Sequence, residues 1–94
     1  KLQKMQQELE EKQAELDVTE FSATAGGGVV SATVTGDKTV KSIKIKPEAV
    51  DLDDLEMLED LIISAVNEAL RAADETVSGE LSKIQGGMAI PGLF

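Results

Sequence analysis

The sequence predicts a small α+β domain in which two helices flank a three-stranded antiparallel sheet. Residues 1–17 and 51–84 carry apolar side chains at helical spacing, which predicts an N-terminal helix and a long C-terminal helix. Residues 18–46 instead alternate apolar and polar side chains, and glycines divide them into three runs. The length of 94 residues suits one domain, so we expect a single unit over residues 1–94.

The first predicted helix covers residues 1–17. Its apolar residues share one narrow face: Leu2, Met5, Leu9 and Leu16. A helix of this length with one such face is marginal on its own, so it must pack on the domain or form a coiled-coil arm. The pattern leaves both open, although two apolar residues in seven favour an arm.

A β-meander is predicted over residues 18–46. Its three strands are expected at 19–25, 29–35 and 39–46. The run Gly26–Gly28 predicts a tight turn, because it lacks the G-x-G-x-x-G and Gly-Lys-Ser/Thr patterns of phosphate-binding loops. In the third strand, Ile43 and Ile45 point to one face, and Ser42, Lys44 and Lys46 point to the other. Pro47 ends this strand because it has no N–H to donate to the ladder.

The second helix is predicted over residues 51–84, with Asp53 as its N-cap and Glu56 three residues later. If it is unbroken from 53 to 84, it is about 48 Å long, at ~1.5 Å per residue. Three strands cannot cover that length, so its C-terminal third must project or meet a second chain. Residues 85–94 form an apolar tail that either frays or docks into an apolar groove.

The composition excludes most kinds of active site. The chain has no Cys, His, Trp or Tyr, so it lacks a thiolate nucleophile and the commonest general base and metal ligand. No Ser lies in a G-x-S-x-G or S-x-x-K motif, and the acidic residues do not form an EF-hand pattern. We therefore expect no catalytic residues, no metal, no cofactor and no small-molecule substrate.

The sequence also predicts no membrane partner. The apolar run at residues 61–63 is far shorter than the ~20 residues of a membrane-spanning helix. The N-terminal region is polar and lacks the apolar segment of a signal peptide, so we expect a cytoplasmic protein.

Charge is unevenly distributed along the chain. The formal net charge is -9, which argues against an evenly basic coat for nucleic acid. Residues 37–46, however, hold four basic residues and one acidic residue, whereas 47–94 hold two basic and eleven acidic. The basic strand has two interpretations: its lysines protect a sheet edge against aggregation, or they contact phosphate. The absence of aromatic residues beside them disfavours stacking on single strands.

An ordered set of segments resembles a known family. The segments are Gly-Gly-Gly-Val-Val-Ser-Ala-Thr-Val-Thr-Gly at 26–36, Val-Lys-Ser-Ile-Lys-Ile at 40–45, Leu-Glu-Met-Leu-Glu-Asp-Leu-Ile at 55–62, Asn-Glu-Ala-Leu-Arg at 67–71, and Gly-Gly-Met at 86–88 with Pro91-Gly92. Over essentially all 94 residues this set is similar to the YbaB/EbfC family of bacterial nucleoid-associated proteins.

This resemblance implies an intertwined homodimer with projecting helical arms. It further implies binding of double-stranded DNA with low sequence specificity, in a cytoplasmic, nucleoid-associated protein that influences nucleoid organisation and gene expression. If the dimer neutralises only ~4–6 phosphates, DNA binding should be weak and salt-sensitive. The alternative is an acidic dimeric protein–protein adaptor with little DNA affinity.

The resemblance also directs attention to particular residues. The candidate DNA contacts, on the arms and on the basic strand, are Lys1, Lys4, Lys12, Lys41, Lys44, Lys46, Arg71 and Lys83. The candidates for the core and the dimer interface are Val30, Val34, Ile43, Ile45, Leu58, Ile62 and Val66.

Overall fold

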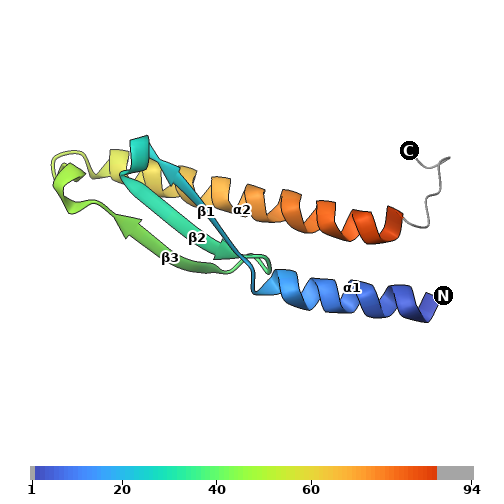
Figure 1. Cartoon of the computed structure of the whole chain (residues 1–94). Helices are drawn as coiled ribbons and strands as arrows, with labels where there is room; N and C mark the ends of the chain where they lie inside the picture. The colour runs from blue at the N-terminus through green and yellow to red at the C-terminus, as the bar shows by residue number, and fades with distance from the viewer. Residues whose placement is uncertain (1, 87–94) are drawn as a thin grey trace.

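The computed structural model describes residues 2–86, which form two helices and one sheet (Figure 1). The elements follow one another as α1 (Leu2–Asp17), β1 (Glu20–Ala25), a 3-10 turn (Gly26–Gly28), β2 (Val30–Thr35), β3 (Val40–Ile45), a second 3-10 turn (Pro47–Ala49) and α2 (Leu55–Gly86). The predicted α+β fold is confirmed, and each predicted strand agrees to within one residue at either end. Residues 85 and 86 continue α2. The remainder of the predicted tail, together with Lys1, lies outside the described residues.

The sheet is an antiparallel meander in the order β1-β2-β3. Across the sheet, Val34 pairs with Phe21 on one side, and Ala32 pairs with Ile43 on the other. The turn between β1 and β2 has φ values of 63°, 68° and 99° at Gly26–Gly28, a region that side chains rarely adopt. The prediction of a glycine turn at this place is therefore confirmed.

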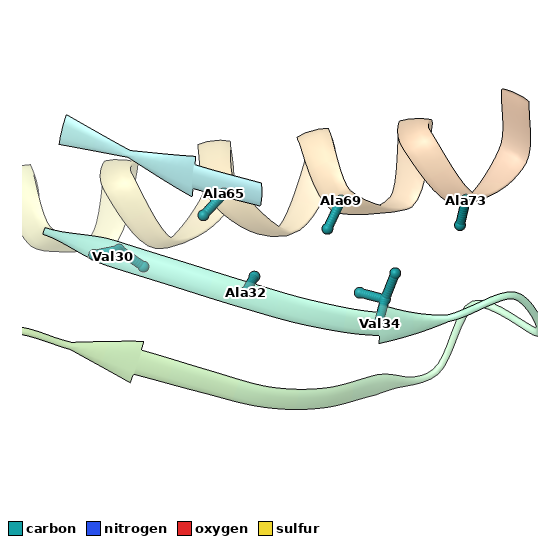
Figure 2. Packing of buried hydrophobic residues seen from close by; sticks show 6 residues of the cluster. All are labelled: Val30, Ala32, Val34, Ala65, Ala69 and Ala73. Atoms are coloured by element: carbon teal, nitrogen blue, oxygen red, sulfur yellow. The ribbon is translucent and has the colours of Figure 1, made fainter. Parts of the chain in front are cut away.

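The core lies between β2 and α2. The face of β2 that points to the helix carries Val30, Ala32 and Val34. Facing it on α2 are three alanines at four-residue spacing: Ala65, Ala69 and Ala73. All six are fully buried, and Figure 2 shows the two rows pointing toward each other. Small side chains on the helix allow it to lie close to the sheet.

One helix is too narrow to cover three strands. A helix with its side chains is about 10–12 Å across, and strands lie about 4.8 Å apart, so α2 covers about two of them. In the structure α2 packs on β1 and β2, and every residue of β3 is exposed. Val40, Ile43 and Ile45 thus continue the apolar face of β2 but remain 43%, 40% and 37% exposed.

The remaining interface candidates lie on α2. Leu58, Ile62 and Val66 are partly buried against the core cluster. Val30 and Val34 are fully buried within it.

The two helices extend together beyond the sheet and run antiparallel (Figure 1). The sequence left open whether the last third of α2 projects or meets a second chain. In the structure, α1 of the same chain lies beside it, and Lys12 Nζ on α1 is 3.2 Å from Glu80 Oε1 on α2. Leu16 at the end of α1 is only 4% exposed. We refer to these paired segments of α1 and α2 as the arm.

The predicted N-cap of α2 is wrong by one residue. The Met57 N–H donates to Asp54 Oδ1 at 3.2 Å, so Asp54 caps the helix that begins at Leu55. Asp53 belongs to the preceding turn, where its N–H donates to Asp51 Oδ1 at 2.9 Å. Within residues 2–86, neither helix is long and apolar enough to cross a bilayer.

Candidate nucleic-acid interface

The two faces of the sheet differ in their chemistry. The face toward α2 is apolar, whereas the opposite face, which we call the outer face, carries mainly hydroxyl and lysine side chains. Strand register and alternation place eight residues there: Glu20, Ser22, Thr24, Ser31, Thr33, Thr35, Ser42 and Lys44. The ion pair with Glu20 brings Lys41 to the same face. Ser22 Oγ and Thr33 Oγ1 share a hydrogen bond of 2.8 Å across two strands. The outer face is therefore polar, with Glu20 and short hydroxyl side chains on β1 and β2 and lysines along β3.

Lys41 and Lys38 are engaged by carboxylates. Lys41 is the extra residue of a β-bulge in β3, and its Nζ forms an ion pair with Glu20. Lys38 lies in the turn before β3, and its Nζ is 2.9 Å from Asp74 Oδ1 on α2. These two lysines neutralise acidic groups of the same chain.

Lys44 and Lys46 differ from their neighbours in this respect. Among residues 2–86, neither of them forms an ion pair. Lys46 extends the ladder past β3, since its N–H donates to the Val29 carbonyl at 2.9 Å. Its Nζ lies 3.8 Å from the position that a Cβ on Gly28 would occupy, so it reaches over the glycine turn. Two unpaired ammonium groups thus flank one edge of the outer face.

The cations of the arm are mostly paired. Lys12 Nζ lies 3.2 Å from Glu80 Oε1 and 3.6 Å from Glu15 Oε1. Lys83 Nζ donates to Glu80 Oε2 at 2.8 Å. The hydrogen bond to Glu80 raises the pKa of Lys12, whereas the hydrogen bonds from Lys83 and then Lys12 lower the pKa of Glu80. The resulting network joins α1 to α2.

Arg71 and Lys4 complete the predicted cations. Arg71 Nη1 is 3.8 Å from Glu68 Oε2, one helical turn earlier. Lys4 is exposed on α1 and forms no ion pair within the part of the chain that the structure describes. The candidates therefore do not converge on one site: some lie on the arm, Arg71 lies on α2, and the others lie along β3.

A shallow groove separates the two helices of the arm. It is lined by Glu8, Glu11, Lys12, Glu15, Glu80, Lys83 and Ile84. Four carboxylates against two lysines disfavour an anionic ligand here. No group of three acidic side chains in residues 2–86 is arranged to hold a metal ion.

Comparison with known families decides the identity. The sequence pattern of the YbaB/EbfC DNA-binding family matches residues 1–88. The chain belongs to this family. The resemblance inferred from the ordered segments is thereby confirmed.

Other YbaB/EbfC-like sequences are similar over nearly the full chain. A nucleoid-associated protein of Clostridium acetobutylicum is 59% identical over 91 residues, which cover 97% of this chain and 81% of that protein. A nucleoid-associated protein of Acetivibrio thermocellus is 59% identical over 93 residues, covering 98% and 82%. The family is named for DNA binding, and the names of these relatives mention no catalytic activity.

A solved structure shares the fold. The crystal structure of an uncharacterized protein from Helicobacter pylori aligns with a TM-score of 0.77, covering 90% of this chain and 89% of the other at 24% identity. At this identity the likeness supports the YbaB/EbfC fold alone.

Two surfaces were not identified from the sequence. The first is the row of hydroxyls on the outer face, whose signal was the Ser/Thr alternation in residues 31–35. The second is the exposed apolar surface around the start of α2, where Leu52 is 80% and Met57 is 57% exposed. Helical periodicity predicts that apolar residues in this region pack against the sheet. The start of α2, however, has apolar residues on more than one face, and that excess is the signal that could have identified the exposed surface.

Proposed function

We propose that this protein is a non-catalytic, nucleoid-associated protein that binds double-stranded DNA as a homodimer with low sequence specificity. Membership of the YbaB/EbfC DNA-binding family is the observation that carries the proposal. The names of the Clostridium and Acetivibrio relatives support association with the nucleoid in the cytoplasm. In that setting the protein would influence nucleoid organisation and gene expression.

The uncovered apolar surface supports the homodimer. Ile43 and Ile45 extend the core face of the sheet without a covering helix, and Ile63 on α2 is 56% exposed. Val40, Ile43 and Ile45 share one exposed face of β3, and apolar patches of this kind mark interaction sites in soluble proteins. A second copy of the chain would cover it, because each copy lacks a cover for its own third strand.

DNA binding is tested by titrating a labelled duplex with the protein. Non-specific binding lies at about 10⁻⁴–10⁻⁶ M even at physiological salt, so saturation is expected at tens of micromolar protein in ~50 mM salt. Two unrelated duplexes of equal length should bind with similar affinity, and binding should weaken steeply as salt is raised. Absence of binding under the low-salt condition would refute the proposed function.

A second candidate function is an acidic protein–protein adaptor. Residues 51–63 hold six acidic and no basic residues, and Leu52 and Met57 are exposed among them. Such a surface fits a basic, apolar segment of another protein. A pull-down with and without nuclease separates the two functions. Partners that survive nuclease and are lost from Leu52→Asp with Met57→Asp favour the adaptor, and partners lost with nuclease favour DNA.

A further inference from the structure

We propose that Lys38, in the turn between β2 and β3, binds a phosphate group of duplex DNA at the base of the arm, and that Asp74 holds its ammonium group in place when DNA is absent. This inference rests on the proposed function, because it adds a contact for the same ligand. Lys38 would bind together with the candidate cations of the arm and of β3, and it replaces none of them.

Lys38 has a backbone conformation that normally favours glycine. Its φ is 68°, and among residues 2–86 it is the one residue other than glycine with a positive φ. A long side chain is uncommon in this left-handed region, because its Cβ lies too close to the following carbonyl oxygen. Strained residues of this kind concentrate at functional sites, so the lysine calls for an explanation beyond the fold.

The turn itself does not require a lysine. The Lys38 N–H donates to the Thr35 carbonyl at 2.8 Å, and the Thr35 N–H donates to the Thr39 carbonyl at 2.9 Å. Asp37 faces into the turn, where its Oδ1 accepts from the Thr39 N–H at 3.2 Å and from the Thr35 hydroxyl. Only the backbone of Lys38 takes part in these bonds, so glycine would form the same turn with less strain.

The ion pair with Asp74 does not explain the lysine either. Lys38 Nζ lies 2.9 Å from Asp74 Oδ1, and the two side chains are 56% and 61% exposed. An ion pair between exposed side chains stabilises a fold little, because water and salt screen it. It does direct the ammonium group toward α2. A phosphate can therefore take the place of Asp74 at small cost, and Arg71, three residues earlier on the helix, remains beside Asp74.

The turn lies where the sheet meets both helices of the arm (Figure 1). A Cβ on Gly36, two residues before Lys38, would lie 2.0 Å from the Leu16 carbonyl oxygen on α1 and 3.4 Å from Val77 Cγ2 on α2. Asp74 is about one helical turn before Val77. Lys38 thus lies at the junction between the cations of the arm and those of β3. Because DNA presents a continuous row of phosphates, a cation at this junction adds to contacts on either side.

The test uses variants whose net charge is controlled. Lys38→Asn removes the ammonium group and changes the chain from -9 to -10, whereas Lys38→Asn with Asp74→Asn removes one charge of each sign and keeps it at -9. Asparagine is chosen because it tolerates the left-handed region. Lys38→Arg keeps the positive charge. Affinity for a labelled duplex is measured over a series of salt concentrations that begins at ~50 mM.

Both variants that carry Lys38→Asn should bind DNA more weakly and with a shallower dependence on salt. The slope of log affinity against log salt should fall by about 0.9 for each bound chain, since one phosphate contact is lost. Lys38→Arg should restore the slope. Thermal unfolding of Lys38→Asn should occur at or above the temperature of wild type, because the substitution relieves backbone strain and loses only an exposed ion pair.

The outcomes separate this inference from the proposed function. A wild-type protein that binds no DNA overturns both. If wild type binds and the double variant keeps its slope, only the contact at Lys38 is overturned, because the effect of Lys38→Asn is then one of net charge. Loss of slope with a markedly lower melting temperature also overturns it, since Lys38 would then hold the turn on α2. Loss of slope in both asparagine variants, with rescue by Lys38→Arg and undiminished stability, supports it.

Discussion

Gly36 is the residue at which the end of α1 meets the sheet, and it has no room for a side chain. A Cβ at this position would lie 2.0 Å from the Leu16 carbonyl oxygen and 2.8 Å from its carbon, both backbone atoms. The Gly36 N–H also donates to the Thr19 carbonyl at 3.0 Å. The absence of a side chain at Gly36 thus lets the end of α1 lie directly against the sheet, at the base of the arm.

We predict that alanine has opposite effects at two glycines. Gly36→Ala should lower the free energy of unfolding by about 1–3 kcal/mol, as overpacking does. Gly79 is exposed within α2, and nothing lies within 4 Å of an added Cβ, so Gly79→Ala should raise it by about 0.5–1 kcal/mol. Urea unfolding at one fixed protein concentration measures both. A neutral Gly36→Ala would show that the close approach to Leu16 is not required.

Single residues also show where prediction from sequence stops. Asp53 and Asp54 are both suitable N-caps by residue type. Which of them caps α2 depends on the residue at which the loop after Pro47 ends and the helix begins. The strands and the glycine turn were predictable because local alternation and backbone angles determine them. The capping residue was not, because the path of the preceding loop determines it.

At the scale of elements, the arm depends on an ion-pair network between α1 and α2. Glu80 accepts from Lys83 on its own helix and from Lys12 on the other. The sequence predicted both helices, but a helical stripe identifies only the buried face and not the element that covers it. Lys12 and Glu80 are far apart in sequence, so their contact could not be predicted from spacing.

We predict that this network weakens in acid. The hydrogen bonds from Lys83 and then Lys12 lower the pKa of Glu80 from its ordinary value of 4.5. A carboxyl whose pKa is lower in the folded state stabilises that state at pH values above 4.5, and this contribution is lost as pH falls through the folded pKa. Glu80→Gln should therefore unfold at a lower temperature than wild type at pH 6, and the difference should shrink at about pH 3.

Glu75→Gln provides the control for that experiment. Glu75 is exposed on α2 and takes part in no ion pair among residues 2–86. Its substitution should leave the melting temperature close to that of wild type at both pH values. A difference between wild type and Glu80→Gln that persists unchanged in acid would contradict an ionic role for Glu80.

At the scale of the whole molecule, the main feature is a sheet with more apolar surface than its helix covers. The described structure measures 60 × 26 × 16 Å, so it is an elongated body whose core is one layer of side chains between β2 and α2. The sequence indicated that Ile43 and Ile45 share a face, but their lack of cover follows from the position of α2 over β1 and β2. That position is a property of the packed fold and not of the strand pattern.

We predict that one substitution on this surface separates assembly from folding. Ile43→Asp should give a species of about 10 kDa in sedimentation at high micromolar concentration, whereas wild type should sediment at twice that mass. Ser42→Asp, the adjacent residue on the outer face, should remain dimeric. A wild-type protein that sediments as a 10 kDa species at this concentration would contradict the homodimer.

Binding of duplex DNA, the central activity proposed for this protein, can be observed directly by nuclear magnetic resonance. Amide resonances of isotope-labelled protein would be followed while a duplex is added at ~50 mM salt, where non-specific binding is expected. A limited set of amides should shift progressively and reach a plateau as duplex is added, and raising the salt concentration should reverse the shifts. Spectra that stay unchanged throughout the titration would contradict the proposed DNA binding.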